Sequence, residues 1–136
     1  MAARTKNCLL SVSAILIGGV LYILFRPHTY IANIFERYFY ITEIRAWLQP
    51  ISCEFVRFYL GDFLWMFALC CGLYAIFPPE ENWSVVCVAI ATACGIAWEV
   101  LQWIGVTTGT GDWMDILMYV LACIAANIIN RKGNIK

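Results

Sequence analysis

Four long apolar runs limit the fold of this chain more than any other feature of its sequence. A membrane-spanning helix needs about 17 to 25 mostly apolar residues, and each run reaches or approaches that length. Hydrophobic residues make up 62% of the 136 positions and charged residues only 13%, whereas a soluble domain has about 25% charged residues. The sequence therefore predicts an all-α integral membrane bundle that forms one domain over residues 1–136. Its four transmembrane helices are expected at 8–25, 60–77, 84–105 and 113–129.

The segment between the first two runs, residues 30–58, combines aromatic with charged side chains. Its apolar side chains recur at helical spacing, at Ile31, Ile34, Phe35, Tyr38 and Phe39. This pattern is typical of an amphipathic helix in the membrane interface, where aromatic rings favour the headgroup level. A break is expected at Pro50, because proline has no backbone N–H with which to continue the helical hydrogen bonds.

Basic residues flank the four runs and indicate the orientation of the bundle. They precede the first run and follow the last, at Arg4, Lys6, Arg131, Lys132 and Lys136. The positive-inside rule then places both termini in the cytoplasm, although the arginines of the first loop count against this assignment. The formal net charge of zero argues against a nucleic-acid partner, which needs a concentrated basic face.

The seven cysteines do not form the pattern of a disulfide framework or a zinc site. All except Cys53 lie inside apolar runs, no CxxC pair is present, and the chain has a single histidine. Free cysteine packs as a small hydrophobe, whereas zinc needs closely spaced Cys and His ligands. We interpret the cysteines as packing residues, with a metal or redox role as the alternative, and predict no cofactor and no metal centre.

A polar cluster interrupts the last two apolar runs. Glu99 and Gln102 lie three residues apart near the end of the third run, and Asp112, Asp115 and Tyr119 form one helical stripe at the start of the fourth. A carboxylate near the hydrocarbon core costs about 2.5 to 3.5 kcal/mol on the insertion scale, so it marks a functional site by default. The glycines of the connecting loop permit a tight reversal, so we expect these five side chains to line one pocket.

Each acidic residue also has a structural interpretation. Asp112 is a good N-cap for the fourth helix, and Asp115 lies at the positive end of its dipole. Asp62 is interpreted as the N-cap of the second helix. Glu99 has no such position, and its alternative is a structural salt bridge to an arginine of the first loop.

The stretch WEVLQWIGVTTGTGDWMDILMYVLACIAANI resembles the VanZ-like family of small multi-pass bacterial membrane proteins. That family carries E-x-x-Q near the end of one helix and D-x-x-D at the start of the next, which Glu99, Gln102, Asp112 and Asp115 match. The family usually also has an arginine in the loop and an asparagine where this chain has Tyr119. The resemblance implies a location in the bacterial inner membrane, and the founding member of the family is linked to teicoplanin resistance.

The first functional hypothesis is an outward-facing pocket that binds a polar ligand of the bacterial envelope. The ligand would be a membrane lipid headgroup, a lipid-linked cell-wall intermediate or a glycopeptide, with Arg45 and Arg57 as anion contacts. The ligand-binding residues would be Glu99, Gln102, Asp112, Asp115 and Tyr119, whose carboxylates would also suit a divalent cation. The alternative is a small subunit that forms homo-oligomers or a channel and uses the acidic cluster for assembly or cation selection. An enzyme with paired carboxylates is the weakest hypothesis, because no Ser/His, Cys/His or metal-hydrolase spacing is present.

Overall fold

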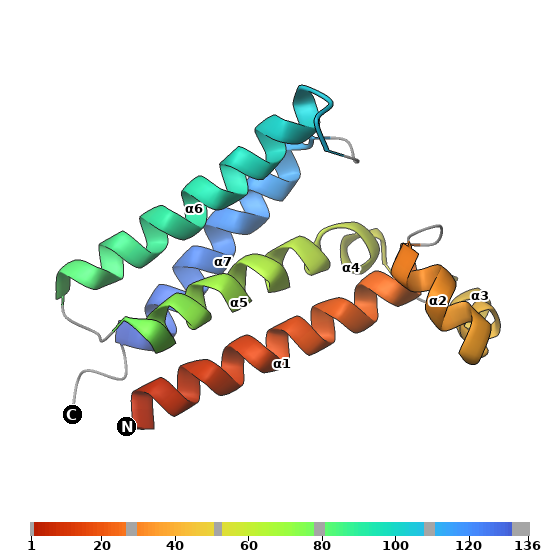
Figure 1. The fold of residues 1–136 in the computed structure, drawn as a ribbon, viewed down its shortest axis with the longest axis horizontal. Helices are drawn as coiled ribbons and strands as arrows, with labels where there is room; N and C mark the ends of the chain where they lie inside the picture. The colour runs from red at the N-terminus through yellow and green to blue at the C-terminus, as the bar shows by residue number, and fades with distance from the viewer. Residues whose placement is uncertain (1, 27–29, 51–52, 78–80, 108–110, 132–136) are drawn as a thin grey trace.

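The computed structural model of the chain describes residues 2–26, 30–50, 53–77, 81–107 and 111–131. The described residues form an all-α fold (Figure 1). Its helices are α1 (Ala2–Phe25), α2 (Tyr30–Tyr38), α3 (Ile41–Leu48), α4 (Glu54–Phe58), α5 (Leu60–Ile76), α6 (Glu81–Trp103) and α7 (Trp113–Arg131). Two of the predicted orientation signals, Lys132 and Lys136, lie outside the described residues.

Three of the four predicted spans are long and apolar enough to cross a membrane. They cover Ala3–Phe25, Ser84–Trp103 and Trp113–Asn130. The remaining predicted span, 60–77, corresponds to α5, which has 17 residues and is shorter than the three candidate spans. It is extended by α4, because Tyr59 donates its N–H to the Phe55 carbonyl and its own carbonyl accepts the N–H of Phe63. The described residues therefore contain three candidate membrane spans and one shorter apolar helix, which indicates a multi-pass membrane protein.

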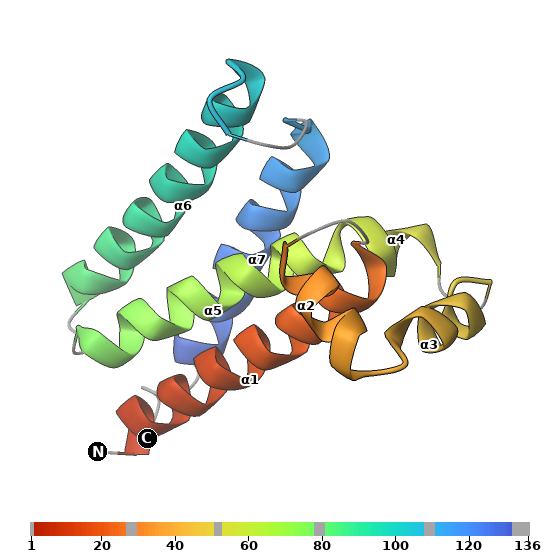
Figure 2. The ribbon, with the colours of Figure 1, turned by 45° about the vertical axis from the view of Figure 1, so that its right-hand side comes forward.

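Successive apolar helices run in opposite directions, and α5 occupies the centre of the bundle (Figures 1 and 2). It packs against α1 on one side and against α7 on another, while α6 packs on α7 and α5. This alternation brings the end of α1, the start of α5, the end of α6 and the start of α7 to one end of the bundle. We call this the polar end, because it contains the acidic residues described below.

Cysteine and alanine side chains make up most of the core between α5, α6 and α7. The buried core residues are Met66, Cys70, Cys71, Tyr74, Cys87, Ala91, Tyr119, Ala122, Cys123 and Ala126. Lipid tails are as apolar as the helices, so helices in a membrane associate through close packing, which small residues allow. Four cysteines belong to this core as the packing interpretation predicts, and the sulfur atoms of Cys70 and Cys123 lie 3.4 Å apart.

The opposite end of the bundle is held by the first turns of α1. Arg4 donates from Nε to the Ala75 carbonyl at 2.7 Å, and Lys6 donates from Nζ to the Ile129 carbonyl at 3.1 Å. Both cations therefore lie at the C-terminal ends of α5 and α7, where the helix dipole favours positive charge. The basic residues that indicate orientation also stabilise the bundle.

The predicted interfacial segment folds as three short helices beside the end of α1 (Figure 2). The helix that carries the predicted apolar spacing, α2, ends at Tyr38, and a further interruption at Phe39 and Tyr40 precedes α3. The helical structure also ends near Pro50, where a break was predicted. Arg45 explains this arrangement. It donates to the carbonyls of Leu24 and Ile23, both at 2.8 Å, and pairs with Glu36 at 2.6 Å. One guanidinium thus caps the C-terminus of α1 and joins it to α2 and α3.

Candidate functional site

Glu99 is the buried centre of the polar end. Its side chain is 1% exposed, and each of its oxygens accepts one hydrogen bond from α7 or the residue before it. Tyr119 donates its hydroxyl to Oε1 at 2.8 Å, and Asp112 donates its backbone N–H to Oε2 at 3.1 Å. The ion pairs found among the described residues join Arg26 to Asp62 and Arg45 to Glu36. Glu99 is therefore held by hydrogen bonds and not by the salt bridge that was its alternative interpretation. Glu99 instead ties the end of α6 to the start of α7.

The end of α6 has the local geometry needed to reverse the chain beside Glu99. Gly105 has a φ of 73°, which glycine adopts without strain. The N–H of Val106 bonds to the Leu101 carbonyl and the N–H of Gly105 to the Gln102 carbonyl, the pattern of a Schellman motif. Gly111 permits a second close contact, because a Cβ there would overlap the indole of Trp103.

The two aspartates of the D-x-x-D element occupy the start of α7. Asp112 accepts the N–H of Met114 on Oδ1 at 3.0 Å, so its carboxylate caps the helix while its backbone serves Glu99. Asp115 lies in the first turn and interacts electrostatically with Asp62, Glu99 and Asp112. Asp112 and Asp115 therefore both occupy positions that favour an acid at the start of a helix, and both also interact with Glu99.

Asp62 and Arg26 are two further residues of the polar end. Asp62 lies in the first turn of α5, whose N-cap position is Tyr59, so the N-cap interpretation of Asp62 is wrong. Its Oδ2 is 3.6 Å from a terminal nitrogen of Arg26, which is an ion pair but too long for a hydrogen bond. The same Oδ2 is buried and has no hydrogen-bond partner among the described residues.

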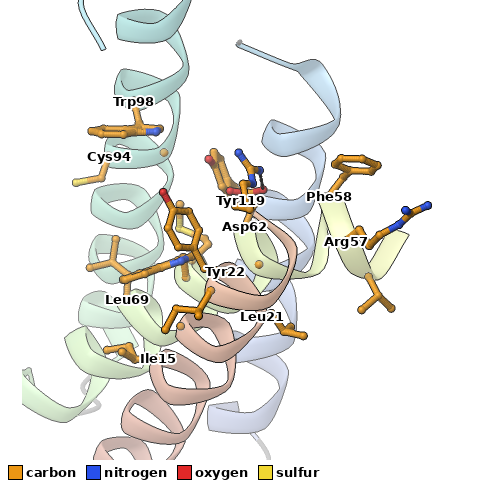
Figure 3. Close-up of a pocket in the computed structure, with 18 of the residues that line it drawn as sticks. Ile15, Leu21, Tyr22, Arg57, Phe58, Asp62, Leu69, Cys94, Trp98 and Tyr119 are labelled. Carbon is orange, nitrogen blue, oxygen red and sulfur yellow. Dashed lines mark ion pairs between the residues drawn. The ribbon is translucent and has the colours of Figure 1, made fainter. Parts of the chain in front are cut away.

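A cavity of about 820 Å³ opens between α1, α5 and α6 (Figure 3). Its polar wall contains Arg26, Asp62, Gln102 and Tyr119. The rest is mostly apolar and includes Ile15, Gly19, Tyr22, Trp65, Leu69, Cys94 and Trp98. Figure 3 shows Trp98 and Cys94 facing the cavity from α6, opposite Tyr22 and Ile15 of α1.

The predicted site residues separate into those on the cavity wall and those behind it. Gln102 and Tyr119 line the cavity. Glu99 accepts the hydroxyl of Tyr119, and Asp112 and Asp115 lie at the start of α7. These three acids are not part of the described lining. The two predicted anion contacts also differ. Arg57 lies on the cavity lining, but Figure 3 shows its guanidinium pointing away from Trp98. Arg45 is the α1 cap described above.

The sequence prediction missed Arg26 and Asp62 as a pair. Asp62 was visible as a charge inside an apolar run, and Arg26 directly follows another run. Antiparallel packing of the first two apolar helices would have placed these two residues at one level.

The described residues contain no group of three His, Cys, Asp or Glu side chains that could hold a metal ion. The contacts that the structure shows at the polar end are hydrogen bonds and an ion pair. Comparisons with known proteins add no assignment: no protein family, no curated protein and no solved structure matches this chain.

Proposed function

We propose that this chain is a membrane protein that binds an amphiphilic ligand in the cavity between α1, α5 and α6. The polar headgroup would lie at Arg26 and Asp62, and a hydrocarbon tail would follow the apolar wall towards Ile15 and Leu69. The observation that carries the proposal is the polarity of this one cavity, with charged groups at one end and aromatic and aliphatic side chains along the rest.

The dimensions of the cavity suit a lipid in one leaflet. Ile15 and Arg26 mark its two ends along α1, and at 1.5 Å rise per residue they are about 16 Å apart along the helix axis. One leaflet of a bilayer contributes about 15 Å of hydrocarbon, half of the total thickness. The cavity therefore spans the depth over which a single acyl chain lies.

The resemblance to the VanZ-like family supports the envelope as the setting. In that setting the ligand would be a membrane phospholipid, a lipid-linked cell-wall intermediate or a lipid-bearing glycopeptide. All three combine a polar head with a hydrocarbon tail. Glu99 would act as a positioning residue, because it holds Tyr119 on the cavity wall from behind.

An assembly or channel function fits the polar end less well. A carboxylate that joins copies of a chain or lines a pore has to face outward or into a water-filled path. Glu99 is 1% exposed and bonds to residues of its own chain. Its enclosure favours ligand binding beside the cluster over contacts between copies.

A cavity-filling variant tests the proposal. Gly19 lies on the cavity lining, and a Cβ added to it meets no atom within 4 Å, so Gly19→Phe would fill the space without displacing a neighbour at Cβ. Leu16→Phe is the matched control, because Leu16 lies on the same helix, is 65% exposed and is absent from the described lining.

The measurement is native mass spectrometry of protein extracted from bacterial membranes in mild detergent. The wild-type chain and Leu16→Phe are expected to retain a bound lipid that Gly19→Phe loses. Equal retention by all three proteins, or no retained lipid on the wild type, would overturn the proposal.

A further inference from the structure

We infer that the cavity selects a zwitterionic headgroup that carries a phosphate and a primary ammonium, as in an aminophospholipid. The inference rests on the proposed function, since it names the class of lipid that the same cavity takes. It is carried by the geometry and charge of the Arg26–Asp62 pair.

This pair presents one positive and one negative group side by side on the cavity wall. Their separation of 3.6 Å exceeds the range of N–H···O hydrogen bonds, so the ion pair gives Oδ2 of Asp62 charge compensation without a hydrogen bond. The Oδ2 of Asp62 is buried, and no donor among the described residues reaches it. A buried carboxylate oxygen in this position calls for a donor, and a donor that carries positive charge would also favour the ionised form of the carboxylate.

A primary ammonium meets that requirement better than other headgroup cations. It has three N–H donors and a compact charge. A quaternary ammonium has the same charge and no N–H, so it would leave Oδ2 without a hydrogen bond. An uncharged hydroxyl of a glycerol headgroup can donate, but it brings no positive charge.

The charges behind the wall strengthen this preference. Asp62 interacts electrostatically with Glu99, and Asp115 interacts with Asp62, Glu99 and Asp112. Arg26 opposes these acids in both cases. Because these acids oppose one another's charge, the polar end favours a cationic group beside Asp62 and opposes a headgroup with net negative charge.

The phosphate of the same headgroup would lie at Arg26. Its side chain is 47% exposed, and a guanidinium provides planar paired donors that match phosphate oxygens. A two-carbon link joins phosphate and ammonium in an ethanolamine headgroup, so the two charges can meet two adjacent charges of the wall. The long contact between Arg26 and Asp62 would then be replaced by two shorter ones to the ligand.

The test uses the full chain in detergent, titrated with phosphatidylethanolamine, phosphatidylcholine and phosphatidylglycerol of identical acyl chains. Native mass spectrometry measures the fraction of protein with bound lipid. Phosphatidylethanolamine is expected to bind about tenfold more tightly than either other lipid, a difference that corresponds to a single strong charge-assisted contact. Lipids with one and two N-methyl groups on the ethanolamine are expected to bind with progressively lower affinity.

Two variants assign the preference to Asp62. Asp62→Asn keeps the shape and removes the charge, and it should bring phosphatidylethanolamine and phosphatidylcholine to within about twofold of each other. Glu43→Gln is the matched control, because Glu43 is an exposed acid of α3 outside the described lining, and it should keep the wild-type preference. Circular dichroism confirms that each variant is folded, and if Asp62→Asn is not, the N-methyl series on the wild type decides.

The outcomes separate the two proposals. Equal binding of the three phospholipids, with loss of all three in Gly19→Phe, would overturn the headgroup inference and leave the lipid cavity standing. Tightest binding of phosphatidylglycerol, or an unchanged preference in folded Asp62→Asn, would also overturn the inference. Lipid binding that Gly19→Phe does not reduce would overturn the proposed function itself.

Discussion

Tyr119 of α7 donates its hydroxyl to Glu99 of α6 across 2.8 Å, and the same tyrosine forms part of the cavity wall. Glu99 is therefore one contact removed from the cavity. Its second hydrogen bond, from the backbone of Asp112, fixes the start of α7 against the end of α6. The least exposed acid among the described residues thus sets the position of a cavity-lining side chain without contacting the cavity itself.

Replacing Tyr119 with phenylalanine should destabilise the protein. The change removes the donor to Oε1 of Glu99, and a buried acceptor left without its partner costs about 1 to 3 kcal/mol. Thermal unfolding in detergent, followed by circular dichroism, should show a lower midpoint. Tyr40→Phe is the control, because Tyr40 is 82% exposed, and its midpoint should match the wild type. An unchanged midpoint in Tyr119→Phe would show that the hydrogen bond contributes nothing to stability.

Two substitutions at Glu99 should have opposite outcomes. In Glu99→Gln the amide oxygen can accept the N–H of Asp112 while the NH₂ group donates to the rotated hydroxyl of Tyr119, so both contacts survive. The change also removes one charge from a group of acids. Thermal unfolding of Glu99→Gln should therefore match or exceed the wild type.

Glu99→Ala should be much less stable than Glu99→Gln. It leaves two donors without an acceptor and opens a void, at a combined cost of about 2 to 5 kcal/mol. The same unfolding measurement decides between the two variants. Equal destabilisation by both would mean that the charge of Glu99, and not its hydrogen bonds, holds α6 to α7.

Local patterns were enough to predict much of this arrangement. The apolar runs located α1, α5, α6 and α7, since membrane-spanning length and composition determine such helices almost without tertiary context. Their alternating direction then brought Glu99, Asp112 and Tyr119 to one end of the bundle. Helical spacing alone indicated that these residues share facing stripes.

The parts that depend on how helices pack could not be predicted in this way. The cavity exists because α5 separates α1 from α6, and no spacing within one helix reveals a gap between two others. The pairing of Arg26 with Asp62 has the same origin. Arg45 was interpreted as an anion contact because it is one of the arginines of the first loop, whereas the carbonyls at the end of α1 are its partners.

Gly95→Ala should disturb the contact between α6 and α7. A Cβ at Gly95 would lie 2.6 Å from Cε of Met66 and 2.7 Å from Cδ2 of Tyr119, so at least one of these side chains has to move. Such overpacking costs about 1 to 3 kcal/mol, and a lower unfolding midpoint is expected. Gly61→Ala is the control, because a Cβ there meets no atom within 4 Å and alanine favours the helix. A midpoint for Gly95→Ala that equals that of Gly61→Ala would contradict the close packing at Gly95.

Cysteine labelling should establish which side of the membrane the polar end faces. Cys53 is exposed and lies at the N-cap of α4, on the same side of the bundle as Asp62. The positive-inside rule puts Arg4 and Lys6 in the cytoplasm, so antiparallel helices put Cys53 outside. A membrane-impermeant maleimide should therefore label intact bacterial cells that express the chain, and Cys53→Ser should remove that labelling. Labelling of Cys53 only after the cells are permeabilised would invert the assignment and place the cavity's polar end in the cytoplasmic leaflet.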